Sequence, residues 1–528
     1  MKKKVEKTFK VGFLLPGRMD PGLLLTLFMV ISYAAVYSCV SIFRISHFDG
    51  QSGFDLAIPD QALWLMSNLK NPFSTVRGLH LFGDHTPYIY LFLVPAYVAW
   101  NNINTLLILQ STALAIGAVG IYLIAKHVLV DARTGRKKSP PDAVQRFAPV
   151  VFAWAYLMYP ALNYLNQDLL FSESFEVPLL IFAFYFAIKG MFRLFATSSI
   201  LAMLCKEDAA ISVFALAAYV YWKLDKRYGA AVAVTAVAWF AFNMGVLLPY
   251  FNGFGYFRHL YGYGVLGRLG RGPADALANV ANNPGILTDI VLTGDNGRYF
   301  ADLFSPVLFT PLLALDVAAI ALPVLATNMI SGYYYTHFIK YHYTAALIPF
   351  VIIATIYGCR RASGVMVTVL KKPRIGFTLL APLLAALIAS TVYSNYAGGG
   401  DFNLVRNGKN VLYALENMGE MNSHIKVMEE AVSQVPADAS VSASYDFLTH
   451  LSHRDNVYMF TTPFKPAYWG INGENMPSER PQYLIIDAPV LDADSRRILD
   501  GLIANGTYAV TSNREGIMVL VFQGTPTK

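Results

Sequence analysis

Residues 54–85 read FDLAIPDQALWLMSNLKNPFSTVRGLHLFGDH, and this stretch decides how the rest of the chain is interpreted. It follows the first long apolar run, carries the acids Asp55, Asp60 and Asp84, and ends at His85. Aromatic and aliphatic residues lie between the acids, so the segment can rest on a membrane surface while its carboxylates face water. A loop that only joined two membrane helices could be short and polar. We therefore interpret this stretch as the reaction centre of a membrane enzyme.

The composition predicts a multi-span membrane protein. The chain has 528 residues, of which 55% are hydrophobic and only 14% are charged, against about 25% charged in soluble domains. Apolar runs close to the length of a membrane span recur along it. One very large soluble core is disfavoured, because cores stop growing at roughly 250–300 residues. The net charge of +7 comes mostly from short basic blocks between apolar runs, which indicates topology and not nucleic-acid binding. The three cysteines, Cys39, Cys205 and Cys359, lie far apart and have neither metal-site nor disulfide spacing.

Charge also predicts the orientation of the chain in the membrane. The basic start, MKKKVEKTFK, places the N-terminus in the cytoplasm, so the first outer loop (residues 44–104) lies outside. The apolar segment 87–100 is short for a crossing, which needs roughly 20 residues. If it crossed, the basic block 133–146 would lie outside, against the positive-inside rule. We therefore expect 87–100 to lie at the outer interface, with aromatic anchors.

The apolar runs predict an α-helical polytopic protein of the cell membrane with about 11 spans, because many of the runs approach the length of a transmembrane helix. In this arrangement every short basic block between spans lies in the cytoplasm. The predicted spans are 23–43, 105–128, 148–164, 177–192, 196–204, 209–222, 229–250, 299–313, 315–330, 343–358 and 375–393.

Composition changes after the three glycines at 398–400. Charged residues become more frequent and helical and strand patterns alternate. We predict a membrane domain over 1–396 and an extracytoplasmic α/β domain over 397–528. The α/β domain is expected to contain helices at 424–435 and 495–504 and strands at 440–443, 457–460, 483–487 and 517–522. It could bind an acceptor, cap a cavity or mediate assembly.

Several segments resemble the membrane proteins of the domain-of-unknown-function family 2079. They are FDLAIPDQALW, STVRGLHLFGDHTPYIYLFLVPAY, the glutamate of SESFEVPLL, CKEDAA and YHYTAALIPF. That family is similar to the GT-C glycosyltransferases, which use polyprenyl-phosphate-linked sugars and carry an essential acid in the first outer loop. The resemblance implies that Asp55 matches this acid and that 87–100 matches a juxtamembrane helix. Many relatives have His-Pro-Glu where this chain has Phe171-Ser172-Glu173, so only Glu173 can be carried over.

The expected activity is sugar transfer from a polyprenyl-phosphate donor to a glycan, lipid or protein acceptor on the outer face. Such transfer needs a base for the acceptor proton and positive charge at the leaving phosphate. Asp55 is the predicted base, and Asp60, Asp84 and His85 would orient it or bind a metal. Glu173 and Asp168 should reach the same face. A divalent metal, Mg²⁺ or Mn²⁺, would be held by Asp55, Asp84 or Glu173. The structural alternative for Asp55, Asp60 and Asp84 is helix capping and turn formation. For Glu173 and Asp168 it is a solvated loop acid.

Cations near the outer face are the candidates for binding the lipid phosphate. Lys340 is the first choice and Arg258 the second, followed by Lys206 and His342. Ordinary headgroup attraction is the alternative for the first two. Lys206, Glu207 and Asp208 interrupt an apolar stretch, so they must lie at the interface or pair within the bundle. A mutual ion pair is the alternative to phosphate binding for Lys206.

Two other functions compete with sugar transfer. A lipid or solute transporter should show repeated halves and polar residues in mid-span, and neither is evident here. A non-catalytic scaffold with an outer binding domain predicts no acid-lined cavity beneath the first outer loop. The transferase instead predicts that Asp55, Glu173 and Lys340 converge on one cavity.

Overall fold

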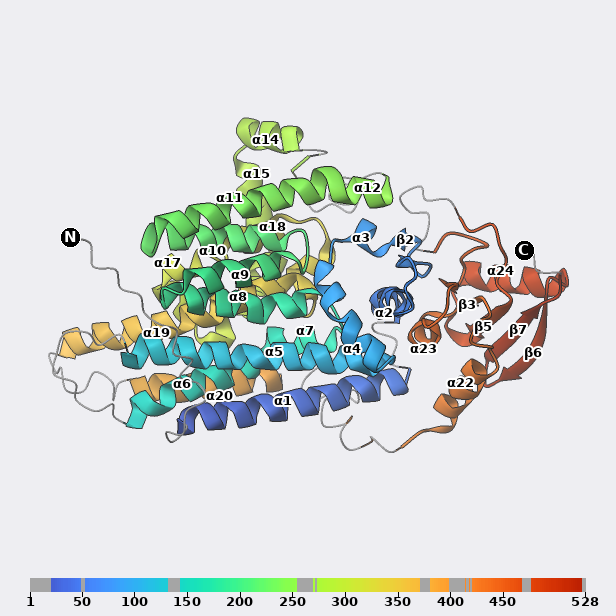
Figure 1. Ribbon diagram of the computed structural model, residues 1–528, viewed down its shortest axis with the longest axis horizontal. Helices are drawn as coiled ribbons and strands as arrows, with labels where there is room; N and C mark the ends of the chain where they lie inside the picture. The colour runs from blue at the N-terminus through green and yellow to red at the C-terminus, as the bar shows by residue number, and fades with distance from the viewer. Residues whose placement is uncertain are drawn as a thin grey trace.

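The computed structural model describes residues 20–48, 53–131, 143–253, 269–270, 273–370, 380–397, 414, 417, 420–467 and 476–524. Long helices lie side by side in one bundle, and a smaller α/β unit lies beyond one end of it (Figure 1). Elements of the first outer loop lie between these two parts (Figure 1).

The bundle confirms the helical membrane class. Within the described residues, four helical segments are long and apolar enough to cross a membrane: Pro21–Ser46, Ile103–Val130, Lys226–Asn252 and His342–Val365. Shorter apolar helices accompany them, so the number of spans stays a prediction. The bundle helices are α1 (Pro21–Ser46), α5 (Ile103–Lys126), η3 (His127–Asp131), α6 (Ala143–Leu157), α7 (Pro160–Gln167), α8 (Glu173–Ile188), α9 (Phe192–Met203), α10 (Ala209–Lys223), α11 (Lys226–Phe242), η4 (Asn243–Leu247), α12 (Leu248–Asn252), α14 (Pro273–Asn282), α15 (Gly285–Val291), α16 (Gly294–Phe304), η5 (Ser305–Val307), η6 (Thr310–Leu313), α17 (Leu315–Ala318), α18 (Leu322–Ile330), η7 (Tyr334–His337), η8 (His342–Leu347), α19 (Ile348–Leu370) and α20 (Leu380–Ala397).

The centre of the bundle is helix α5, which packs against α1, α6 and α8. Gly117 allows the close approach of α6, because a Cβ there would lie 2.7 Å from the Cζ atom of Tyr156. The buried Tyr156 hydroxyl donates to the Leu114 carbonyl at 2.7 Å, so this tyrosine buries its ring without leaving its hydroxyl unpaired.

Proline and loop geometry alter several predicted spans. The predicted span 148–164 is divided into α6 and α7, and Pro160 occupies the first turn of α7, where its missing N–H costs nothing. The predicted spans 299–313 and 315–330 are a series of short helices, α16 to α18. Leu308 and Phe309 between them have positive φ angles, which an α-helix cannot contain.

The first outer loop forms its own small structure. Its elements are α2 (Gly53–Ser67), β1 (Phe73–Ser74), β2 (Leu79–His80), α3 (Leu81–Asp84), η2 (Tyr88–Phe92) and α4 (Val94–Ala99). Segment 87–100 contains only η2 and the six-residue α4. Both are too short to span a bilayer, and the interfacial position of the segment stays a prediction.

The α/β unit contains a five-stranded sheet in the order β4-β3-β5-β7-β6. Strand β3 pairs in parallel with β4 and β5, whereas β7 is antiparallel to β5 and β6. Its elements are α22 (Ser423–Ser433), β3 (Val441–Ala443), η9 (Tyr445–Phe447), α23 (Leu448–Leu451), β4 (Val457–Met459), β5 (Tyr483–Asp487), η10 (Ala488–Val490), α24 (Ala493–Ala504), β6 (Tyr508–Arg514) and β7 (Ile517–Phe522). All predicted elements are present, and β6 was missed because most side chains of this edge strand are partly or fully exposed. The domain boundary predicted at residues 396–397 adjoins residues outside the described ones and stays a prediction.

Candidate functional site

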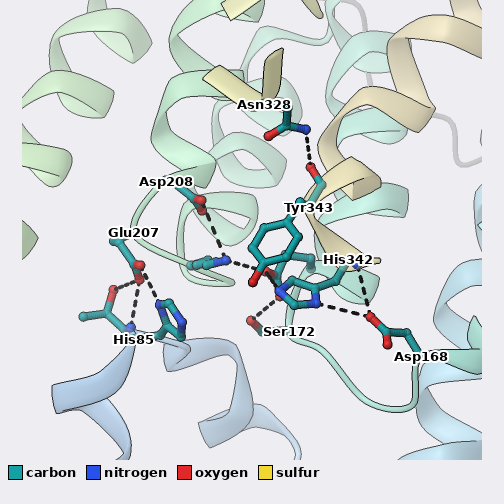
Figure 2. Close-up of polar contacts among 11 residues, drawn as sticks. His85, Asp168, Ser172, Glu207, Asp208, Asn328, His342 and Tyr343 are labelled. Atoms are coloured by element: carbon teal, nitrogen blue, oxygen red, sulfur yellow. Dashed lines mark hydrogen bonds and ion pairs between the residues drawn. The ribbon is translucent and has the colours of Figure 1, made fainter. Parts of the chain in front are cut away.

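Polar side chains from five separate segments gather at the end of the bundle that faces the first outer loop, and one of the segments is the first turn of α2, which carries Asp55. The other four are the end of α3, the loop between α7 and α8, the loop between α9 and α10, and the start of η8 (Figure 2). We name this group the polar cluster; it consists of Asp55, Asp84, His85, Asp168, Glu173, Lys206, Glu207, Asp208 and His342.

Lys206 and Glu173 form a buried ion pair. The Lys206 Nζ atom lies 2.7 Å from Glu173 Oε1, and their side chains are only 6% and 8% exposed. Asp208 Oδ2 lies 3.8 Å from the same Nζ atom. Glu173 begins α8, where the N-terminal end of the helix favours a carboxylate. The ion-pair alternative for Lys206 therefore describes its geometry.

His85 and Glu207 form a second pair. His85 Nδ1 lies 2.7 Å from Glu207 Oε1, and the Thr86 backbone N–H donates to Glu207 Oε2 at 3.1 Å. Burial disfavours protonation of His85, but the neighbouring Glu207 outweighs it and raises the pKa of His85 to about 9. Burial likewise opposes ionisation of Glu207, yet contact with His85 keeps the pKa of Glu207 lowered. Both groups are therefore charged at neutral pH.

His342 connects two acids of the loop before α8. Its Nδ1 atom lies 3.2 Å from Asp168 Oδ2, and its Nε2 atom lies 4.0 Å from Glu173 Oε1. The ring stacks on Phe171 with centroids 3.7 Å apart, which fixes its orientation. The His342 backbone N–H also donates to Asp168, so η8 starts at a defined position against this loop.

Asp55 lies in the first turn of α2 and faces the same group. Removal from bulk water raises the pKa of Asp55 to about 6, and Asp168 and Asp84 add to the shift whereas His342 and His85 oppose it. The residue is nevertheless exposed to solvent. Asp55 is therefore accessible to solvent, and its electrostatic neighbours are histidines and acids of the polar cluster.

The remaining predicted residues are placed differently. Asp84 Oδ1 lies 3.3 Å from Nη2 of Arg77, a largely buried arginine. The sequence predictions did not include Arg77, although a basic residue in this apolar loop indicates a nearby acid.

Asp60 does not join the polar cluster: it is fully buried and accepts hydrogen bonds from Tyr97 and from Ser452 of the α/β unit. Its predicted role beside Asp55 is wrong in geometry, because the two carboxylates point to different sides of α2.

Of the four predicted phosphate-binding residues, the structure describes Lys340, Lys206 and His342. Lys340 is half-buried between η7 and η8, two residues before His342. Arg258 lies outside the described residues. His342 and Lys206 are in the polar cluster, each paired with an acid.

The acids of the site do not form a three-ligand group in the described residues. In the described part of the chain, no three His, Cys, Asp or Glu side chains are grouped closely enough to hold a metal ion. The predicted Mg²⁺ or Mn²⁺ at Asp55, Asp84 or Glu173 stays a prediction, and no step below depends on one.

Comparison with known proteins gives a family and a fold. Residues 50–519 match the model of a family described as predicted membrane protein (DUF2079). The chain is similar to the crystal structure of ArnT from Cupriavidus metallidurans bound to undecaprenyl phosphate, with a TM-score of 0.52, 13% identity, and coverage of 94% of this chain and 97% of that one. The apo form of the same protein gives a TM-score of 0.49 at 12% identity, with the same coverage. At such identity the similarity shows a shared fold. No curated protein matches the sequence.

Proposed function

Because the chain belongs to the DUF2079 family of predicted membrane proteins and has the fold of ArnT, a GT-C glycosyltransferase, we propose that it is a membrane glycosyltransferase. Its donor would be a polyprenyl-phosphate-linked sugar and its acceptor a hydroxyl group of a glycan, lipid or protein on the outer face. The observation that carries the proposal is the position of Asp55, a solvent-accessible carboxylate surrounded by protein and by paired charges.

Asp55 would act as the general base. In the proposed reaction the acceptor hydroxyl attacks the anomeric carbon of the sugar, and its proton moves to an Asp55 carboxylate oxygen. The new C–O bond forms as the bond between the sugar and the phosphate breaks, which releases polyprenyl phosphate. With a pKa of about 6, Asp55 is about nine-tenths ionised at neutral pH and still holds a proton better than an ordinary aspartate does.

Positive charge for the leaving phosphate would come from Lys340, with His342 two residues beyond it and Arg258 as a further candidate. Lys206 is a weaker choice than its sequence position indicates, because Glu173 already accepts its hydrogen bond. A phosphate at Lys206 would have to share the ammonium group with Glu173, at the cost of like-charge repulsion.

The chain's charge pattern supports an outer-face site. Helix α8 begins at Glu173 in the polar cluster and ends beside Lys189, about 24 Å away at 1.5 Å per residue. Helix α10 begins after Asp208 and ends at Lys223. The basic ends of these helices lie opposite the polar cluster, and we propose that they lie in the cytoplasm with the N-terminus.

The test is a transfer assay on the purified protein in lipid nanodiscs with polyprenyl-phosphate-linked sugars. Asp55→Asn should reduce turnover by about 100-fold or more, the usual contribution of a general base. Asp289→Asn, which changes an exposed acid on α15, should not. Unchanged transfer by Asp55→Asn would refute the base assignment.

Lipid binding is measured separately. Lys340→Ala should weaken polyprenyl-phosphate binding, and normal binding would remove Lys340 from the proposal. A wild-type protein that binds the lipid donor but transfers no sugar would instead support the transporter or the scaffold.

A further inference from the structure

Helix α2, which carries Asp55, packs between two hydrophobic cores. Phe54 and Ala57 belong to the same buried cluster as Phe447 and Leu448 of the α/β unit. On another side of the helix, Leu56, Ala62 and Leu63 pack with Tyr97 and Leu106 of the first outer loop and α5. The α/β unit thus completes the burial of a helix that the bundle covers only in part (Figure 1).

Polar contacts fix the same face of α2 to the α/β unit. The buried Asp60 accepts hydrogen bonds from Tyr97 and Ser452, and its Oδ2 atom lies 3.3 Å from His453 Nε2. A buried carboxylate with three partners resists displacement, because moving it would leave a charge unpaired.

Gln61 adds a second polar contact one residue along. Its Nε2 atom donates to Thr75 Oγ1 at 2.8 Å and to the Arg454 carbonyl at 3.1 Å. The Thr75 hydroxyl in turn donates to the Val457 carbonyl at 2.9 Å, at the start of β4. The helix, the loop hairpin and the sheet are therefore joined in one network.

Gly53 brings the start of α2 against the α/β unit without space for a side chain. A Cβ atom at this position would lie 2.9 Å from Cδ1 and 3.1 Å from the carbonyl carbon of Tyr445. Any larger residue would therefore separate α2 from this backbone.

Tyr445 follows the carboxyl end of β3, which lies between its parallel neighbours β4 and β5. In open α/β sheets, ligands bind at this edge, where the strand order reverses. Here Tyr445, two residues after β3, packs against the start of α2. This contact argues against an acceptor site at that part of the sheet edge.

We propose that the α/β unit is a positioning domain for α2. At about 100° per residue, Asp55 lies about 120° around the helix from Gln61, so the α/β unit contacts the side of α2 away from Asp55. Holding that side fixes where the Asp55 carboxylate stands in the polar cluster. Asp60, Gly53 and Ser452 are positioning residues in this proposal. It rests on the proposed function for the task of Asp55, but the anchoring of α2 can be measured without any activity.

The first measurement is hydrogen–deuterium exchange of the peptide containing residues 53–67 in the full-length protein. Gly53→Val, Asp60→Asn and the milder Ser452→Ala should each raise amide exchange in α2 by about tenfold or more. The control is Leu499→Ala, which opens the core on the other side of the sheet, away from α2. It should destabilise the α/β unit without loosening α2 to the same degree. Unchanged exchange in α2 for the three variants would overturn the proposal.

The second measurement is the kinetics of sugar transfer. Because a misplacement of about 1 Å can reduce turnover 100-fold, the α2 variants should lower kcat while KM for the lipid donor changes by less than about twofold. Ser452→Thr, which retains the hydroxyl, should recover most of the loss seen in Ser452→Ala. Faster exchange in α2 with unchanged kcat would refute the positioning role. Faster exchange in a protein whose wild type transfers no sugar would refute the proposed function and leave the anchoring of α2 intact.

Discussion

The buried pair of Lys206 and Glu173 gives the sharpest prediction about stability. Its charged atoms are 2.7 Å apart and both side chains are almost fully buried. At an effective dielectric constant of about 20, their attraction is about 6 kcal/mol. Lys206→Met removes this attraction and leaves Glu173 buried without its main partner, so we expect a loss of about 3–5 kcal/mol. His342, 4.0 Å from Glu173, offsets part of the cost.

Removing both charges should cost less than removing one. In Glu173→Gln with Lys206→Met, neither buried charge remains, and such replacements are often close to neutral. We therefore expect a coupling free energy of at least about 3 kcal/mol between the two sites. Unfolding in detergent or nanodiscs, followed by denaturant titration or thermal melting, measures all three variants against the wild type.

An exposed pair provides the matched control. Lys70 Nζ lies 2.6 Å from Asp455 Oδ1, but these side chains are 46% and 60% exposed. Lys70→Met should cost less than about 1 kcal/mol, because solvent screens the pair. If the losses of the two Lys206–Glu173 single variants simply add in the double variant, the attribution to a buried ion pair is wrong.

Three further predictions concern pH and packing. The rate of sugar transfer should fall as pH drops through about 6, because Asp55 then becomes protonated. Asp168→Asn removes a negative neighbour of Asp55 and should move this fall to lower pH. An unmoved profile would contradict the assignment of the fall to Asp55. The His85–Glu207 pair should stabilise the protein fully between about pH 4.5 and 6.5 and lose its contribution as pH rises through about 9, because the pKa of His85 is raised and that of Glu207 is lowered in the folded state. The difference in melting temperature between wild type and His85→Gln should therefore vanish in alkali, and a constant difference would argue against the ionic role. Gly358→Ala should destabilise by about 1–3 kcal/mol, because its Cβ would lie 2.8 Å from a carbonyl carbon at the start of η6; denaturant unfolding checks this, and unchanged stability would show that α19 and η6 can separate at little cost.

The two aspartates of α2 illustrate how far the sequence reaches. Asp55 and Asp60 lie five positions apart in one loop, and both looked suited to catalysis. In the structure one faces the polar cluster and the other binds Ser452 of a distant segment. Helical periodicity separates their directions by about 140°. Which of the two faces the polar cluster depends on the segments that pack on each side of α2, and the local sequence does not contain that information.

The short helices α16 to α18 show a different limit. Their apolar composition predicted two full spans, because hydropathy sums the transfer free energy of a segment without its backbone geometry. Prolines and two left-handed residues divide the segment instead. Buried contacts to α19 and α20 stabilise these interruptions, and such contacts come from residues far along the chain.

The sequence by itself determined the helical membrane class and most elements of the α/β unit. These follow from hydrophobic length and periodicity, which act over one segment at a time. Only the tertiary structure decided which charges meet, as with His85 and Glu207, which are 122 positions apart. It also decided that the α/β unit holds the helix of Asp55. Such pairings depend on distance and burial between segments, and electrostatic energies in a protein change steeply with both.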